Sequence, residues 1–313
     1  MIEISIIVPL FNSKDVVEDC LDSVLFAMGE VDDADLIVID NGSNDGSYEL
    51  VQGRYGHVAK IQQRRKGTIA SLRNFGAQLA QGEYLFFLDS DCVISKTYLQ
   101  DVKRVFREVT TDASGSKCEI PASPSWCEET WQRLHRRTRD GYINYINSGN
   151  FVIKRSAFNQ VGGFDERLET DEDVDLGERL RAVGFKIYES HDLKAIHLRN
   201  AKTLQDFFKK EVWRGLGMAR SHRRLFHDKV LMTTLAHIAF NLIGISCVAL
   251  LPVPLAGRAA LMAACSLFAP VVSVAYRYAA LRRFYRPIGS VILYHLWLDA
   301  KIFSLLFRVC GAR

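Results

Sequence analysis

The sequence predicts an α/β domain built on a mainly parallel sheet, followed by a C-terminal region of membrane helices. In the N-terminal part, continuous apolar runs rich in β-formers alternate with helical patterns, which is typical of a parallel sheet covered by helices on both faces. Farther along, residues 230–257 and 259–276 contain no Asp, Glu, Lys or Arg. A helix of about 20 apolar residues is long enough to cross a bilayer core.

The predicted elements of the N-terminal domain follow from these runs. Strands are expected at 3–10, 35–40 and 83–88, with a weaker one at 57–61. Amphipathic patterns between them predict helices at about 14–27, 46–54 and 68–80.

The two uncharged runs predict a membrane hairpin. Its spans are expected at about 230–252 and 258–276, with Pro252, Pro254 and Gly257 at the turn. Basic residues flank the outer ends, which predicts a multi-pass protein of the cytoplasmic (inner) membrane with its N-terminal domain in the cytosol. These flanking residues are Arg220, Arg223, Arg224 and Lys229 before the hairpin and Arg277, Arg282, Arg283 and Arg286 after it. The alternative is a buried helical pair in a soluble domain.

Two further segments complete the expected organisation of domain 1–200, segment 201–228 and membrane region 229–313. Segment 201–228 is rich in Lys, Arg and aromatics, which favours a basic amphipathic element at an anionic membrane surface. Residues 287–308 carry Asp299 and Lys301 in an apolar background, which favours a helix lying at the interface, with a third short span as the alternative.

Composition excludes several classes of protein. With 40 basic and 36 acidic residues the net charge is only +4, which argues against a nucleic-acid partner. The seven cysteines are odd in number and form no CxxC pair, which argues against a disulfide framework or a zinc site and favours a reducing compartment. Residues 1–10 lack a basic start and are interpreted as a strand, not a signal peptide.

Polar clusters follow three of the expected strands, at 9–12, 40–43 and 89–91. Parallel sheets bind ligands outside the carboxyl ends of their strands, so these clusters are expected to converge. Asp89 and Asp91 follow directly after the expected strand at 83–88, and a strand this buried has no structural need for two carboxylates at its end. Oxygen ligands of this kind suit Mg²⁺ or Mn²⁺ bound together with substrate phosphates. The alternative is a solvated loop whose Asp residues cap the next helix.

An acidic segment at 169–175 precedes an expected helix at about 173–183 that ends before Gly184. It lacks the glycine and glutamate spacing of a calcium loop. Thr170 and Asp173 have the spacing of a capping box. A functional alternative is that the start of this helix projects carboxylates into the ligand crevice.

The order of these motifs resembles family 2 glycosyltransferases with the GT-A fold, over about residues 3–200. The resemblance rests on Ile6–Asn12, Val38–Ser47, Arg73–Gly76, Gly82–Asp91, Gly149–Phe151, Val161–Glu166 and Glu172–Leu176.

The resemblance implies a site for a nucleotide-diphosphate sugar. Pro9 and Asn12 would line the nucleotide pocket, and Asp40 would accept a hydrogen bond from the base, typically uracil. Arg73 would reach the base or the phosphates, although without the resemblance it is interpreted as a surface charge on a helix. Ser90 would also contact the donor.

The resemblance also implies the metal ligands. Asp89 would touch ribose or metal, and Asp91 would be the principal ligand of Mg²⁺ or Mn²⁺. His197 would complete the metal shell, the alternative being a histidine packed in the core.

Catalysis is implied for the Glu172–Asp173 pair. Asp173 would act as general base on the acceptor hydroxyl, and direct attack with one base predicts inversion at the anomeric carbon. The helix dipole would lower the pKa of Asp173 and neighbouring acids would raise it. Gly163, Phe164 and Asp165 are expected to contact the acceptor.

The predicted function is an inverting, metal-dependent glycosyltransferase that uses a UDP- or GDP-sugar and a membrane-associated acceptor, expected to be a polyprenyl-linked glycan. The Gln-x-x-Arg-Trp signature of processive synthases is absent, which favours transfer of one sugar per encounter. One alternative makes a lipid-phosphate sugar. A nucleotidyltransferase is disfavoured because no glycine- and lysine-rich loop follows the first strand, and a silent scaffold because the acidic motifs are intact.

Overall fold

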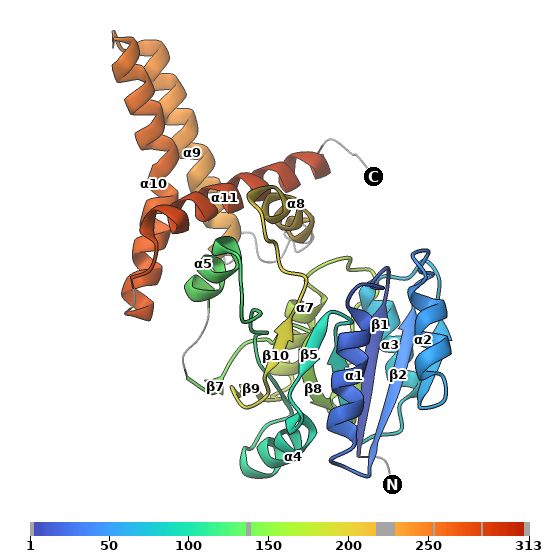
Figure 1. Cartoon of the computed structure of the whole chain (residues 1–313). Helices are drawn as coiled ribbons and strands as arrows, with labels where there is room; N and C mark the ends of the chain where they lie inside the picture. Colours follow the sequence, from blue (N-terminus) through green and yellow to red (C-terminus); the bar gives the residue numbers. More distant parts are fainter. Residues whose placement is uncertain (1–2, 136–138, 217–228, 253, 283, 310–313) are drawn as a thin grey trace. The chain divides into compact units, whose positions relative to one another are not determined.

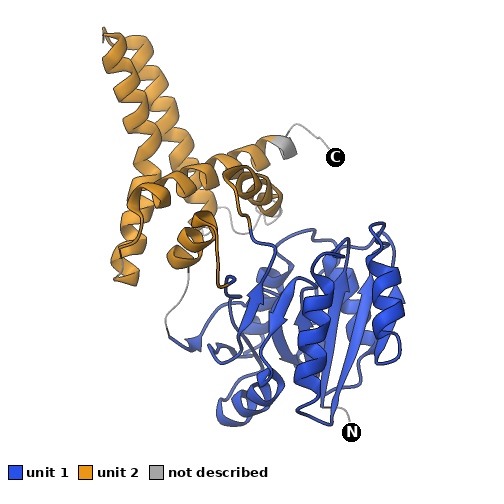
Figure 2. Ribbon diagram, viewed as in Figure 1, with its two compact units in different colours: residues 1–121, 138–200 blue, residues 122–137, 201–313 orange. Residues whose placement is uncertain are grey.

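The computed structural model describes residues 3–135, 139–216, 229–252, 254–282 and 284–309. The chain divides into two compact units, which are shown in different colours in Figure 2. The first, here called the sheet unit, comprises residues 1–121 and 138–200, and the second, the helical unit, comprises residues 122–137 and 201–313.

One half of the main sheet is parallel. Strand β1 (Ile4–Leu10) pairs in parallel with β2 (Ala34–Asp40) and with β4 (Tyr84–Leu88), and β2 pairs in parallel with β3 (Ala59–Gln63). These strands confirm the four expected from the sequence, and the weakest of them, β3, begins two residues later than expected. Their carboxyl ends therefore meet at one edge of the sheet (Figure 1).

The other half of the sheet is mixed. The full order is β3-β2-β1-β4-β8-β6-β9-β7, with β8 antiparallel to its neighbours β4 and β6. A separate two-stranded ribbon joins β5 to β10. The added strands are β5 (Cys92–Ile94), β6 (Ala113–Gly115), β7 (Gly141–Tyr142), β8 (Asn150–Lys154), β9 (Ile187–Glu189) and β10 (Ala195–His197).

Helices cover both faces of the sheet, because the side chains of each buried strand alternate between two cores. Ile6 and Phe86 belong to one core, while Ile7 and Phe87 belong to the other. The helices of this unit are α1 (Val17–Met28), α2 (Ser47–Tyr55), α3 (Ile69–Leu79), α4 (Tyr98–Glu108), α6 (Arg155–Gln160) and α7 (Glu172–Ala182). The expected helices are confirmed, with ends that shift by up to three residues.

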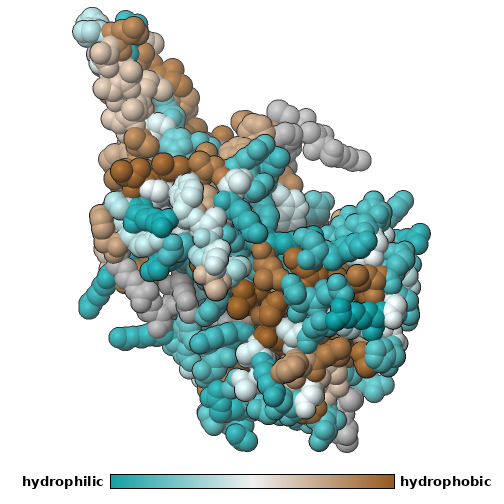
Figure 3. Space-filling model, in the orientation of Figure 1, coloured by the Kyte–Doolittle hydropathy of each residue, from teal (hydrophilic) through white to brown (hydrophobic). Residues whose placement is uncertain are grey.

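The helical unit consists of α5 (Trp126–His135), α8 (Leu204–Gly215), α9 (Lys229–Leu250), α10 (Leu255–Leu281) and α11 (Pro287–Val309). Within it α9 and α10 run side by side, while α11 crosses them at a wide angle (Figure 1). By length and composition α9, α10 and residues 287–306 of α11 could each span a membrane. The hairpin presents apolar side chains such as Leu242 and Val272 on its surface, and Figure 3 shows a largely apolar exterior there.

These helices indicate membrane association. Four of the basic residues used to orient the hairpin lie outside the described residues, namely Arg220, Arg223, Arg224 and Arg283. The interfacial position of α11 stays a prediction, as does the domain boundary at residue 200.

Candidate active site

Two loops at the carboxyl edge of the sheet are held together by hydrogen bonds. Asp89, Ser90 and Asp91 lie between β4 and β5, and Ser90 donates a hydrogen bond to the Ser13 hydroxyl, 3.0 Å away, in the loop after β1. Asn12 in that loop has a φ of 46°, a left-handed conformation that Asn adopts more readily than most residues. The predicted convergence of these strand ends is thus present in the structure.

Arg73, on α3, links Asp89 to Glu172. One guanidinium nitrogen lies 2.6 Å from Asp89 Oδ1 and another 2.7 Å from Glu172 Oε1. The interpretation of Arg73 as a surface charge is wrong, because the residue is only 2% exposed. Burial tends to lower its pKa, but the charges of Asp89 and Glu172 outweigh that effect and raise it. Arg73 is therefore a permanent buried cation at the edge of the sheet.

Glu172 and Asp173 are adjacent but have different surroundings. Glu172 is buried and accepts hydrogen bonds from Arg73 and from the Ser148 hydroxyl, 2.9 Å away. Asp173 is only half-buried. Desolvation, followed by the negative charges of Glu172 and Asp171, raises the pKa of Asp173 to about 7. The opposing influences of helix dipole and neighbouring acids are thus resolved in favour of a raised pKa.

The predicted capping box at the start of this helix is wrong. Asp171 is the N-cap residue, with a φ of 64°, and makes no side-chain capping bond. The buried Thr170 hydroxyl has no hydrogen-bond partner in the part of the chain that the structure describes. The left-handed turn at Asp171 replaces the cap geometry that a capping box requires.

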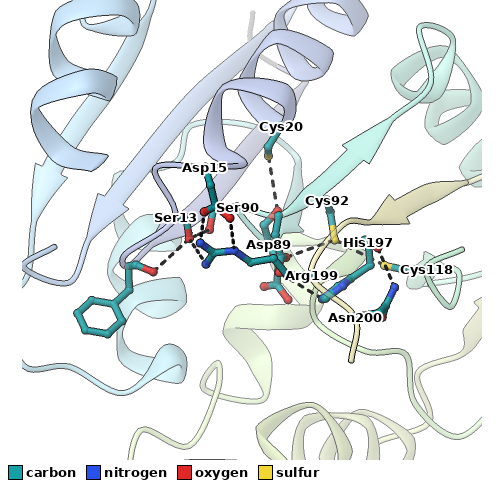
Figure 4. Close-up of polar contacts among 12 residues, drawn as sticks. Ser13, Asp15, Cys20, Asp89, Ser90, Cys92, Cys118, His197, Arg199 and Asn200 are labelled. Atoms are coloured by element: carbon teal, nitrogen blue, oxygen red, sulfur yellow. Dashed lines mark hydrogen bonds and ion pairs between the residues drawn. The ribbon is translucent and has the colours of Figure 1, made fainter. Parts of the chain in front are cut away.

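Asp91 and His197 lie together because β5 and β10 pair. The register places His197 opposite Cys92, and His197 Nε2 lies 3.4 Å from Asp91 Oδ2. Figure 4 shows the imidazole beside the loop of Asp89 and Ser90. The Nδ1 atom of His197 is buried and has no hydrogen-bond partner among the described residues.

The group formed by Asp91, Cys92 and His197 fits a divalent metal ion. One ligand atom from each lies within 4.8 Å of the others. The Cys92 sulfur lies 3.8 Å from that of Cys118, and this contact together with burial raises the pKa of Cys92 well above its usual value. The Asp91 carboxylate supplies an oxygen donor of the kind that suits Mn²⁺, and the His197 imidazole supplies a nitrogen donor.

Arg199 is a site residue that sequence reasoning missed. Its guanidinium donates a hydrogen bond of 2.9 Å to the backbone oxygen of Asn12. It also forms an ion pair with Asp15, which Figure 4 shows. The loop that follows His197 is thereby fastened to the loop after β1. The only signal in the sequence was its place two residues after His197.

Asp40 and Pro9 occupy buried positions at the same edge. Asp40 is fully buried and accepts hydrogen bonds from the backbone nitrogen of Gly42, at 2.8 Å, and from the side chain of Gln63, at 3.1 Å. Pro9 lies inside β1, opposite Ile39 of β2. Both residues therefore shape the strand ends, and their contacts with a nucleotide stay a prediction.

The segment expected to contact the acceptor packs against Arg73 through Phe164. The Phe164 ring is 2% exposed, packs edge-on against Phe87, and has the Arg73 guanidinium 5.7 Å from its centre. Gly163 has a φ of 72°. Asp165 is bound by Arg167, whose hydrogen bonds lower the pKa of Asp165 to about 2. Acceptor binding by this segment stays a prediction.

Comparison with known sequences places this arrangement among sugar-transferring enzymes. A model of the family described as glycosyl transferase family 2 matches residues 5–162. Glycosyltransferase AglE of Haloferax volcanii is 24% identical over 222 residues, which cover 68% of this chain and 72% of AglE. Poly(ribitol-phosphate) beta-N-acetylglucosaminyltransferase TarP of Staphylococcus aureus is 33% identical over 115 residues, 36% of this chain and 35% of TarP. The chain thus spans about a third of TarP.

Solved structures have the same fold. Mannosyltransferase PcManGT of Pyrobaculum calidifontis, in complex with GDP-Man and Mn²⁺, aligns with a TM-score of 0.61 at 14% identity, covering 99% of this chain and 88% of its own. GalNAc-T7 with UDP, GalNAc and Mn²⁺ aligns with a TM-score of 0.52 at 14% identity, covering 76% of this chain and 51% of its own. The predicted GT-A fold is confirmed.

Proposed function

Because the chain belongs to glycosyl transferase family 2, we propose that it is an inverting, metal-dependent and non-processive glycosyltransferase that uses a nucleotide-diphosphate sugar. The observation that carries this proposal is the Arg73 bridge, which brings the carboxylate of the Asp89–Asp91 loop and the Glu172–Asp173 helix start to one place. A donor-binding loop and a base are thus joined through a single buried cation.

Asp91 and His197 are proposed to hold the metal ion, with Asp89 close by. A bound divalent cation stabilises the negative charge that develops on a departing diphosphate. The Asp91 carboxylate would supply an oxygen donor and the His197 imidazole a nitrogen donor. The Nδ1 atom of His197 is buried and has no hydrogen-bond partner within the ranges that the structure describes. Pro9, Asn12, Asp40 and Ser90 are proposed to line the nucleotide side of the same edge.

Asp173 is proposed to take the proton from the acceptor hydroxyl as that oxygen attacks the anomeric carbon. Its pKa of about 7 suits a general base, which works best when its pKa lies near the working pH. Glu172 is occupied by Arg73 and Ser148, so it positions Arg73 and the helix start. Direct attack assisted by one base inverts the anomeric configuration.

The acceptor is proposed to be membrane-associated, with a polyprenyl-linked glycan as the favoured class. Three helices of the helical unit are long and apolar enough to cross a membrane, which would hold the enzyme where lipid-linked acceptors lie. Attachment to the cytoplasmic membrane with the sheet unit in the cytosol is part of the same proposal, as are the interfacial α11 and the domain boundary at residue 200.

A donor screen tests the proposal. The full chain, purified in detergent, is incubated with UDP- and GDP-sugars and Mg²⁺ or Mn²⁺, and release of nucleoside diphosphate is measured with and without lipid-linked glycans. We expect release with one donor, dependent on metal and abolished in Asp91→Ala. Equal release by Asp91→Ala would refute the metal assignment, and release of pyrophosphate would identify a nucleotidyltransferase instead.

A further inference from the structure

One carboxylate and two histidines meet in the helical unit. Asp299 is the only Asp or Glu between residues 229 and 313, and His237 and His295 are the only histidines there. These three residues come from α9 and α11, and they lie together in the structure. Ionisable side chains within apolar helices are costly and usually have a function.

The ligand atoms of this group converge. His237 Nε2 lies 3.1 Å from Asp299 Oδ1, and His295 Nδ1 lies 2.8 Å from Asp299 Oδ2. The two imidazole rings are nearly perpendicular, with centres 5.2 Å apart. Each carboxylate oxygen therefore faces a different ring nitrogen.

The surroundings of the group resemble those of a metal ligand set. His237 is fully buried, whereas the Asp299 side chain is 38% exposed and could admit an ion. The outer nitrogen of His295, Nε2, lies 2.8 Å from the Ser266 hydroxyl on α10. Metal-bound histidines commonly use their second ring nitrogen in this way, since the hydrogen bond fixes the orientation of the ring.

We infer that His237, His295 and Asp299 form a binding site for one divalent transition-metal ion of the zinc class. Zinc lies about 2.0–2.2 Å from nitrogen and oxygen ligands, so neighbouring ligands of a tetrahedral ion lie about 3.4 Å apart. The separations of 3.1 Å and 2.8 Å, each to a different oxygen of Asp299, lie within about 0.6 Å of that spacing. One ligand atom from each of the three residues lies within 4.8 Å of the others. Two imidazoles and one carboxylate select zinc or cobalt over magnesium, which prefers oxygen.

The site is separate from the proposed donor-metal group. Asp91 and His197 belong to the sheet unit, whereas the three residues of the new site belong to the helical unit. An ion held there would cross-link α9 to α11, and through Ser266 it would also order α10. The inference does not depend on the proposed sugar transfer.

Cobalt spectroscopy tests the site. The full chain carrying Asp91→Ala and His197→Ala, which removes the donor-metal ligands, is purified in detergent with a tag that contains no histidine and is stripped with a chelator. Titration with Co²⁺ should give the intense visible absorption of a four-coordinate ion, saturating at one equivalent. Zn²⁺ should displace it, and excess Mg²⁺ should not.

Variants in that background give the controls. Asp299→Asn and His237→Gln retain hydrogen-bonding capacity and should abolish the absorption, and Zn²⁺ should raise the melting temperature of the background chain but not of Asp299→Asn. Ser266→Ala should weaken binding by about 10–100-fold. His135→Ala, in the same unit, should leave it unchanged. Absence of the absorption in the background chain, or its persistence in Asp299→Asn and His237→Gln, would show that the group is only a hydrogen-bonded tie between helices.

Discussion

Arg73 and Glu172 lie 99 residues apart in the sequence, yet a guanidinium nitrogen of one is 2.7 Å from a carboxylate oxygen of the other. The pair is nearly inaccessible, with side-chain exposures of 3% and 10%. The pair fastens the start of α7 to α3, and it thereby also positions Asp173, the residue proposed as the base.

Removing one partner of this pair should lower the stability of the fold. Arg73→Leu leaves Glu172 as an uncompensated buried charge and should lower the free energy of unfolding by about 3–5 kcal/mol. Chemical denaturation followed by fluorescence measures this change. Arg73→Leu combined with Glu172→Gln should recover much of the loss, and a double variant no more stable than the single one would contradict this explanation.

Asp173→Asn should lower kcat by about 10²–10⁴-fold, because the acceptor hydroxyl loses its base. Binding of nucleotide and metal should stay within a few-fold of the parent, as measured by calorimetry. Asp175→Asn is the matched control, since Asp175 lies two residues after Asp173 on the same helix and is paired with Arg179. Activity that survives in Asp173→Asn would indicate an acceptor that is already anionic, such as a lipid phosphate.

The rate should depend on pH through Asp173. A base with a pKa of about 7 is active when deprotonated, so kcat/KM should fall by about tenfold per pH unit below pH 7 and level off above it. A profile that stays flat from pH 5 to about 8 would show that another group acts as the base.

The same raised pKa affects stability. Between the ordinary value of 3.8 and about 7 the folded chain binds more protons than the unfolded chain, so stability falls as pH rises through this window. Asp173→Asn should therefore melt at a higher temperature than the parent at pH values above about 7, and the difference should vanish near about pH 4. An equal difference at both pH values would contradict the assignment.

His197→Ala should weaken Mn²⁺ binding by at least about tenfold, because even the loss of groups that only support a metal ligand has effects of that size. Electron paramagnetic resonance of free Mn²⁺ measures the affinity, in a chain that also carries His237→Gln to remove the helical site. His191→Ala is the control, since His191 is paired with Asp140. Unchanged affinity in His197→Ala would restore the interpretation of His197 as a packing residue.

The carboxylate of Asp89 occupies the space that a side chain at position 149 would need. The Cβ of an alanine at 149 would collide with Asp89, so Gly149→Ala should displace that carboxylate and lower kcat/KM by about 10²-fold. Gly53→Ala, on the exposed surface of α2, meets no atom within 4 Å and should leave activity unchanged. Equal activity in the two variants would argue against a role for the position of Asp89.

Prediction from the sequence succeeded where the signal is local. The buried strands β1, β2 and β4 appear as continuous apolar runs, and the acidic start of α7 was visible within a few residues. In the mixed half of the sheet β6 and β7 were not predicted, because they are only three and two residues long and carry no periodicity.

The site was predicted less completely, because its electrostatics depend on distant contacts. The burial of Arg73 requires Phe164 beneath it and Glu172 beside it, and no pattern around residue 73 contains that information. The role of Arg199 likewise depends on the backbone of Asn12, 187 residues away. The capping-box error at Thr170 arose because a left-handed turn at Asp171 cannot be recognised from composition.

The chain enters the helical unit twice, at residues 122–137 and again from residue 201 onward. The ring of Trp131, in the first of these segments, packs against the rings of Phe207, Tyr294 and Trp297 in the second. A chain truncated after residue 200 would therefore expose the aromatic side chain of Trp131 on α5, because its neighbours would be missing. Such a fragment should aggregate. A fragment that contains only the sheet unit would need a short linker in place of residues 122–137 as well, since these residues belong to the helical unit.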